Sequence, residues 1–175
     1  MRKQVFFLFL RRGFSLIELL VVIAVLAVLM GLALPAIGGA LNSAKRATMQ
    51  NDVTQIANAV MMFETEYGRL PNVSGGNVDD SLMRILLGED DNENPRKIAF
   101  LEPPTYKPGK GGYKAGQGYL DPWGNPYKIA LDTDYDNKVS ARDGEVRKKV
   151  AVWNDEQSIP DMKQSQKARM KVQSW

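Results

Sequence analysis

The sequence contains no cysteine and no histidine. Their absence excludes disulfide bonds, thiolate and imidazole metal ligands, cysteine nucleophiles and triads built on histidine. An enzyme is not expected, because nothing in the sequence positions the remaining Asp and Glu side chains around a substrate cleft. Without disulfides, an extracytoplasmic domain must be held together by packing or by a metal ion.

An excess of basic charge is also lacking once the first thirteen residues are set aside. The formal net charge is +3, but four of the 23 basic residues (Arg2, Lys3, Arg11 and Arg12) precede Gly13. The other 19 basic residues face 20 acidic ones, so the rest of the chain has a formal net charge of −1. Nucleic acid is therefore not expected as a partner.

A long apolar run is present near the N-terminus. Residues 14–37 carry a single charged side chain, Glu18. A helix of this length exceeds the ~30 Å hydrocarbon core of a bilayer. Four basic residues precede the run, whereas Lys45 and Arg46 follow it, which predicts a cytoplasmic N-terminus and a C-terminal domain on the other side. A removable secretory signal is the alternative, but the apolar region of such signals is usually only ~7–15 residues long.

The start of this run carries a recognisable pattern. The stretch GFSLIELL, from Gly13 to Leu20, resembles the processing site of type IV prepilins and of the pseudopilins of type II secretion. The resemblance implies that a prepilin peptidase cuts between Gly13 and Phe14 and that Phe14 is then N-methylated. Glu18 and Pro35 become residues 5 and 22 of the mature chain, where the family carries the same residue types.

Glu18 requires a physical explanation, because a carboxylate at mid-bilayer costs roughly 2.5–3.5 kcal/mol on insertion scales. If subunits pack with an axial offset, the α-amino group of Phe14 can approach the carboxylate of Glu18 on a neighbouring subunit. In a low dielectric such a pair is attractive, so the charge favours assembly over the isolated monomer. The alternative is a glutamate that snorkels into the headgroup layer.

The apolar run continues into an amphipathic pattern. Apolar residues recur at helical spacing along one face: Met49, Val53, Ile56, Val60, Phe63 and Tyr67. Asp52 is among the polar residues placed largely off that face. The pattern predicts one helix from Phe14 to about Tyr67, ended by Gly68.

The remaining segments predict a small mixed domain. A short helix over residues 81–87 is expected, with Asp79 or Asp80 as its N-cap and Gly88 at its end. Short strands are expected over 97–101 and 127–131, and a final strand after Gly144. Whether the tail, residues 160–175, docks or stays mobile is left open.

A second motif identifies a narrower group of proteins than the general prepilin pattern of residues 13–20 does. Residues 121–127, DPWGNPY, resemble a segment of the major pseudopilin of type II secretion. The resemblance implies an α+β fold like that of type IV pilins, in which a long N-terminal helix packs on a small antiparallel sheet. The expected organisation is a leader (1–13), a transmembrane and assembly helix (14–37), its amphipathic continuation (38–67) and a periplasmic globular domain (68–175).

Acidic residues then follow at the spacing of a calcium loop. Asp132, Asp134 and Asp136 occupy positions 1, 3 and 5, Lys138 offers its carbonyl at position 7, and Asp143 stands at position 12. Asn137 takes the sharp-turn position, where asparagine is the residue best suited after glycine to a left-handed backbone. The family resemblance also implies calcium, though not this ligand set. The alternative is an acidic turn that only hydrogen-bonds its own backbone.

Together these features predict a structural subunit of a type II secretion pseudopilus, anchored in the bacterial inner membrane and assembled into a periplasmic filament. The implied partners are other copies of the chain, minor pseudopilins, an inner-membrane assembly platform and the prepilin peptidase. Two alternatives stay open: a type IV pilus subunit for adhesion, motility or DNA uptake, and a membrane-tethered calcium-dependent binding module.

Overall fold

The computed structural model describes residues 14–73, 75–160 and 162–175, without the side chains of residues 34–36. Its first element is one long helix, α1 (Leu16–Tyr67), so the predicted helix from Phe14 to Tyr67 is confirmed to within two residues. The chain divides after Leu41 into two units, and the second unit comprises Asn42–Trp175.

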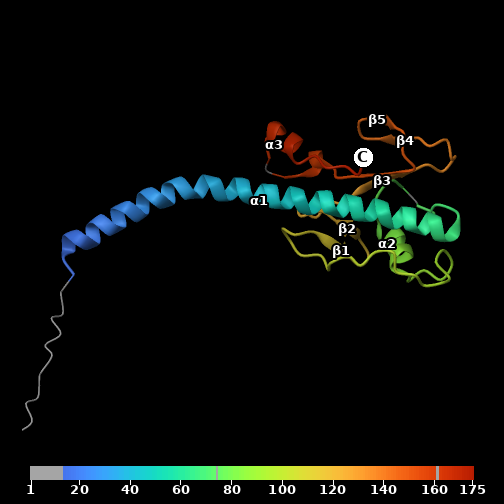
Figure 1. The fold of residues 1–175 in the computed structure, drawn as a ribbon, viewed down its shortest axis with the longest axis horizontal. Coiled ribbons are helices and arrows are strands. Elements are labelled where there is room, and N and C mark those ends of the chain that lie inside the picture. The colour runs from blue at the N-terminus through green and yellow to red at the C-terminus, as the bar shows by residue number, and fades with distance from the viewer. Residues whose placement is uncertain (1–13, 74, 161) are drawn as a thin grey trace, which may run out of the picture. The chain divides into compact units, whose positions relative to one another are not determined.

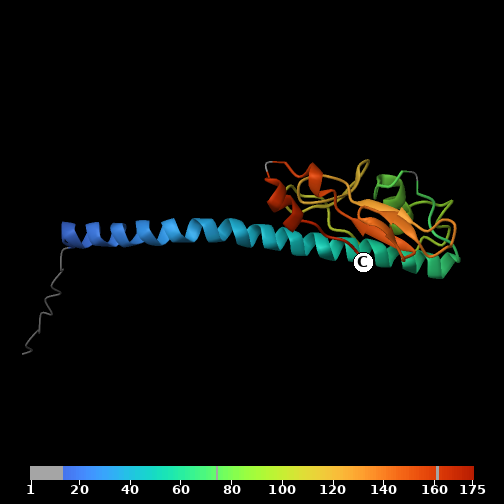
Figure 2. The ribbon, with the colours of Figure 1, turned by 90° about the horizontal axis from the view of Figure 1, so that it is seen from above.

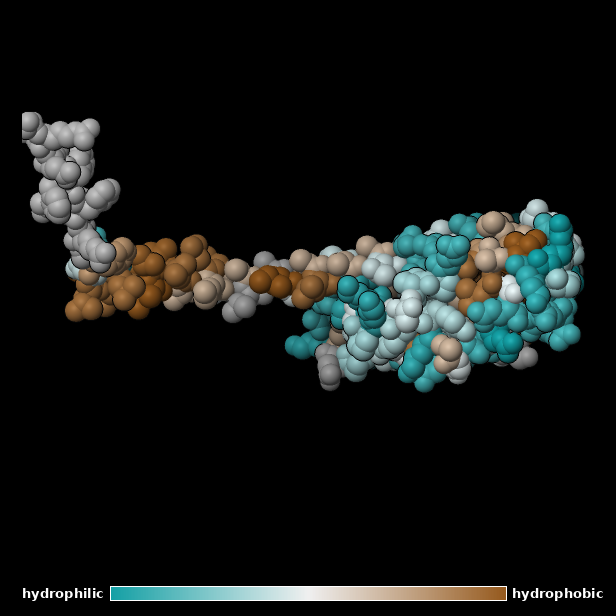
Figure 3. All heavy atoms as spheres, turned by 90° about the horizontal axis from the view of Figure 1, so that it is seen from below, coloured by the Kyte–Doolittle hydropathy of each residue, from teal (hydrophilic) through white to brown (hydrophobic). Residues whose placement is uncertain are grey.

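In the first unit every described side chain from Phe14 to residue 33 is exposed. An 18-residue window of α1 has a mean hydropathy of 2.9, and none of it is buried. Figure 3 shows the resulting apolar surface along this part of the helix. Length and composition therefore allow this segment to cross a membrane.

The second unit is built around the C-terminal part of α1. Three two-stranded antiparallel sheets contribute to it: β1 (Gly112–Lys114) with β2 (Gly118–Leu120), β3 (Lys128–Leu131) with β6 (Val150–Trp153), and β4 (Val139–Ala141) with β5 (Gly144–Val146). The short helices are α2 (Asp80–Leu87), η1 (Glu156–Ser158) and α3 (Gln164–Arg169). In Figure 1 the strands and short helices of this unit spread above and below α1, and Figure 2 shows that they all lie on one side of the helix.

The predicted apolar face of α1 forms the centre of the core. Met49, Val53, Ile56, Val60 and Phe63 are fully buried, and Tyr67 packs against them. The core is completed by α2, the β3–β6 sheet and the C-terminal segment. Burial of such side chains typically contributes about 1.5–3 kcal/mol each.

Helix α2 follows from its capping residues. The carboxylate of Asp79 accepts the backbone N–H of Leu82 at 3.0 Å, and Gly88 takes a left-handed conformation with φ 77°. Both ends agree with the sequence prediction.

The strand predicted over 97–101 is wrong, and so is the placement of Asp52 off the apolar face. Residues 97–101 form no strand, because the side chain of Asn94 binds the backbone N–H and carbonyl of Ile98, while Phe100 N–H donates to the carbonyl of Leu86. Asp52 is buried, with only 5% of its surface exposed.

Candidate functional site

The residues predicted for processing and assembly lie at the start of α1. Gly13 falls outside the described residues, and Phe14 is exposed immediately before the helix. Pro35 lies within α1, and its side chain is also outside the described part of the chain. The structure therefore places Phe14 just before an exposed apolar helix and Glu18 in the first turn of that helix.

Glu18 has a local partner, Ser15, which was not predicted although the two residues have the S-x-x-E spacing of a capping box. Its carboxylate accepts the backbone N–H of Ser15 at 2.8 Å, which satisfies one of the donors left free at a helix N-terminus. The position in the first turn also lets the negative charge interact favourably with the helix dipole. Glu18 thus stabilises the helix start within one chain, and any test of its charge must separate these two effects.

The predicted calcium loop connects β3 to β4. Asp132 is buried, and its two carboxylate oxygens accept the backbone N–H groups of Asp136 at 3.0 Å and Asn137 at 2.8 Å. Asn137 has φ 60°, which confirms the left-handed conformation expected there. Tyr135 also has φ 60°, although tyrosine is not a residue type that indicates a left-handed backbone. Asp132 therefore holds the loop in a tight turn.

The structure brings together three of the predicted ligands. Carboxylate oxygens of Asp132, Asp134 and Asp136 lie within 4.8 Å of one another, and the latter two residues are exposed. Clustered carboxylate oxygens are the donors that calcium prefers. The pKa of Lys138 is raised, chiefly by its hydrogen bond to Glu145 and by the charge of Glu145. The charges of Asp136 and Asp134 raise it further.

Asp143 lies elsewhere. It occupies the turn between β4 and β5, where its carboxylate pairs with Lys171 and Arg142, and the pKa of Asp143 is lowered, chiefly by the hydrogen bond from Lys171. The predicted ligand at position 12 is thus paired with cations of the C-terminal segment and the hairpin turn. Lys138 pairs through its ammonium with Glu145 at 3.1 Å.

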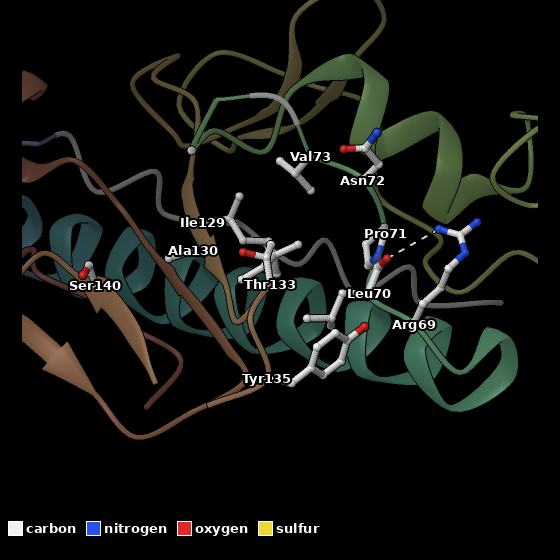
Figure 4. Close-up of a pocket in the computed structure, with 12 residues that line it drawn as sticks. Arg69, Leu70, Pro71, Asn72, Val73, Ile129, Ala130, Thr133, Tyr135 and Ser140 are labelled. Atoms are coloured by element: carbon white, nitrogen blue, oxygen red, sulfur yellow. Dashed lines mark hydrogen bonds between the residues drawn. The ribbon is translucent and has the colours of Figure 1, made fainter. Parts of the chain in front are cut away.

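A shallow groove adjoins the acidic loop. It has a volume of about 580 Å³ and lies between the segment that follows α1 and strand β3. In Figure 4, Leu70 and Pro71 line one side, while Ile129, Thr133 and Tyr135 line the other.

A buried polar cluster that was not predicted from the sequence lies between α1 and the strands. Tyr119 and Tyr127 donate their hydroxyl hydrogens to the two carboxylate oxygens of Asp52, at 3.0 and 2.8 Å, and both tyrosines are fully buried. Burial raises the pKa of Asp52, and the two hydrogen bonds oppose this shift. Its only signal in the sequence is an acid next to Val53 of the apolar face.

A second missed network is centred on Arg142. Its guanidinium donates to the backbone carbonyl of Asn154 at 3.2 Å and to the side-chain oxygen of Gln173 at 3.1 Å, and pairs with Glu156. Buried Asn154 in turn binds backbone groups at residues 170 and 172. The open question of the tail is thereby answered: the C-terminal segment is docked, and Trp175 contacts Trp153 edge to face.

Comparison with known proteins agrees with these features. Residues 9–34 match the prokaryotic N-terminal methylation motif. The type II secretion system core protein G of Aeromonas hydrophila is 30% identical over 67% of this chain and 71% of its own length. The proteins of that name from Pseudomonas aeruginosa and Escherichia coli are each 28% identical, over 66% and 78% of this chain and 70% and 85% of their own lengths.

No solved structure matches the chain. The family is nevertheless shown by sequence, because the N-terminal motif is present and the chain matches 71% of the Aeromonas protein at 30% identity. The chain belongs to the family of type II secretion system core protein G.

Proposed function

We propose that this chain is the structural subunit of a type II secretion pseudopilus and has no catalytic role. The observation that carries the proposal is the methylation motif at residues 9–34, joined to an exposed apolar helix, in a chain that belongs to the core protein G family. A prepilin peptidase cuts after Gly13, and Phe14 becomes the methylated N-terminus.

Assembly then depends on the charge of Glu18. The new amino group of Phe14 is only four residues from Glu18 in its own chain, where the Glu18 carboxylate already accepts the N–H of Ser15. A neighbouring subunit displaced along the helix axis brings its amino group to the same carboxylate. Attraction between the two charges in a low dielectric favours this register.

The subunit is held in the inner membrane by the apolar part of α1, with the N-terminus in the cytoplasm and residues 42–175 in the periplasm. Its partners are other copies of itself, minor pseudopilins and the inner-membrane assembly platform. The distribution of Lys and Arg around the apolar run supports this orientation.

Calcium is the cofactor we propose for the acidic loop. Asp132, Asp134 and Asp136 supply oxygen donors, and from its spacing in the loop we expect the carbonyl of Lys138 to be a further ligand. A bound Ca²⁺ would offset two of the three negative charges of these carboxylates, which otherwise repel one another. Asp132 contributes separately by fixing the backbone of residues 136 and 137.

Mass spectrometry of the N-terminal peptide from native membranes tests the processing step. A chain that begins with methylated Phe14 is expected. A chain that still begins at Met1, in cells with an active peptidase, would refute the proposal and favour a tethered binding module.

Two substitutions separate the charge of Glu18 from its role at the helix end. Glu18→Gln keeps an oxygen that can accept the Ser15 N–H but removes the charge, whereas Glu18→Ala removes both. We expect both variants to reach the membrane and neither to form filaments in an assembly assay. Normal filaments from Glu18→Gln would show that the helix cap, and not the charge, is what assembly requires.

A further inference from the structure

Basic side chains gather at one end of the second unit. Residues 38–51 contain Lys45 and Arg46 and no acid, and residues 162–175 contain four basic side chains and no acid. We name these six residues the basic end: Lys45, Arg46, Lys163, Lys167, Arg169 and Lys171. Both sequence segments therefore contribute positive charge without an acidic residue of their own.

The fold brings the two segments together. Arg46 and Gln50 of α1 line the same shallow hollow as Lys171 and Trp175 of the C-terminal segment. Helix α3 lies beside this part of α1 in Figures 1 and 2. The docking is held by the Gln50 side chain, which donates to the backbone carbonyl of Gln173 at 2.8 Å.

Most of this charge is not neutralised within the described residues. Of the six basic residues, Lys171 forms an ion pair, with Asp143, and the other five have no carboxylate partner in the described part of the chain. Lys45 lies over the ring of Trp123 at 4.8 Å, and Lys167 donates to the carbonyl of Gln157. Arg46, Lys163 and Arg169 are exposed, so they remain available to an anionic partner.

We propose that the basic end binds the headgroups of anionic phospholipids while the subunit is held in the membrane. The proposal rests on the membrane placement of the apolar segment given above. Lys45 is eight positions beyond Ile37, and in helical conformation this step advances the chain ~12 Å. The headgroup layer is about 5–8 Å deep on each side of a bilayer, so Lys45 lies within about one Debye length of its outer surface. Basic side chains beside a membrane segment are attracted to anionic lipid surfaces.

Trp175 favours a lipid surface, and not a soluble anion, as the partner of the basic end. Its ring packs on Trp153, and it lines the same hollow as Arg46 and Lys171. Tryptophan is enriched at membrane interfaces because one part of its ring is apolar and another donates a hydrogen bond. The basic end therefore combines cations with an aromatic residue suited to the headgroup layer.

The absence of cysteine makes a direct test possible. Ser165→Cys, an exposed position in α3, provides a unique attachment site for a fluorophore in the full-length chain. The chain is reconstituted into vesicles of phosphatidylcholine alone or mixed with phosphatidylglycerol, and energy transfer to a headgroup-labelled acceptor lipid is measured. We expect transfer to increase with phosphatidylglycerol and to fall at high salt.

A charge-matched pair of variants localises the effect. Lys163→Gln with Arg169→Gln should lower the ratio of docked to undocked domain about 25-fold, since each basic residue near an anionic surface is worth about fivefold. The control is Arg147→Gln with Lys148→Gln, which removes the same charge from exposed positions between β5 and β6. The control should leave energy transfer unchanged.

Three other outcomes would overturn the proposal in distinguishable ways. Energy transfer that is independent of lipid charge and salt in an inserted chain would refute the headgroup contact alone. Transfer that depends on protein density in neutral vesicles would assign the basic end to a second copy of the chain. A chain that carbonate extracts from the vesicles would refute the membrane placement, and with it the proposed function.

Discussion

The buried cluster of Asp52, Tyr119 and Tyr127 gives the sharpest prediction about stability. The two hydroxyl groups each donate to one carboxylate oxygen, at 3.0 and 2.8 Å, and all three side chains are buried. Asp52→Ala leaves both hydroxyls without this partner, and a buried polar group left unsatisfied costs about 1–3 kcal/mol. We expect Asp52→Ala to lower the free energy of unfolding by about 2–6 kcal/mol.

The pH dependence has a definite sign. Burial raises the pKa of Asp52 above its ordinary value of 3.8, so the folded chain holds this proton to a higher pH than the unfolded chain. Protonation of Asp52 therefore stabilises the folded state. This contribution to the free energy of unfolding is complete below the pKa of Asp52 in the unfolded chain and is lost as the pH rises through its pKa in the folded chain. Each unit of upward shift corresponds to about 1.4 kcal/mol.

Urea denaturation of residues 42–175 and of the full chain in detergent, at a series of pH values, measures this effect. Asp52→Asn cannot ionise, so its stability relative to the unsubstituted chain should rise with pH above about 3.8 and then level off. Asp91→Asn, at an exposed loop position, is the control and should leave the pH slope unchanged. A parallel pH dependence in Asp52→Asn and the unsubstituted chain, or a cost below about 0.5 kcal/mol for Asp52→Ala, would refute the reasoning.

Three further predictions concern the loop, a close backbone contact and the tail. Calcium at 100 times its Kd should stabilise the domain by about 2.7 kcal/mol and raise its Tm in a thermal melt. Asp134→Asn should reduce this rise in Tm. If EDTA leaves the Tm unchanged relative to calcium, the proposed calcium site is refuted. Gly118→Ala should destabilise far more than Gly116→Ala in the same melt, because a Cβ at 118 would overlap the carbonyl oxygen of Val78 whereas one at 116 has open space. Equal costs would contradict this. Asn154→Ala should cost about 2–6 kcal/mol in urea denaturation, since it leaves two backbone groups of the C-terminal segment unpaired. Proteolysis of that segment should also accelerate.

Local features of the sequence predicted the parts of the fold that depend on neighbours in the chain. The apolar spacing from Met49 to Tyr67 defined the buried face of α1, and Asp79 and Gly88 defined the ends of α2. Each of these signals acts within one or two helical turns. The loop at Asp132 was predictable for the same reason, since its hydrogen bonds reach only five residues ahead.

Features set by distant partners were not predictable in this way. The partners of Asp52 lie 67 and 75 residues along the chain, at Tyr119 and Tyr127. Asp143 fits the spacing of a twelfth ligand, but Lys171, which follows 28 residues later, pairs with its carboxylate. Spacing within a motif does not show whether a distant residue such as Lys171 will pair with a predicted ligand. Only the folded chain shows this.

The packing of α1 against its own domain has a mechanical consequence. Residues 49–63 of this helix are packed into the core and are also joined to the strands by the paired tyrosines on Asp52. A force along the helix axis therefore acts on these contacts as shear. The force is shared by contacts over several helical turns. Many contacts must slip together before the helix moves against its domain, so residues 42–175 follow an axial displacement of this helix as one body.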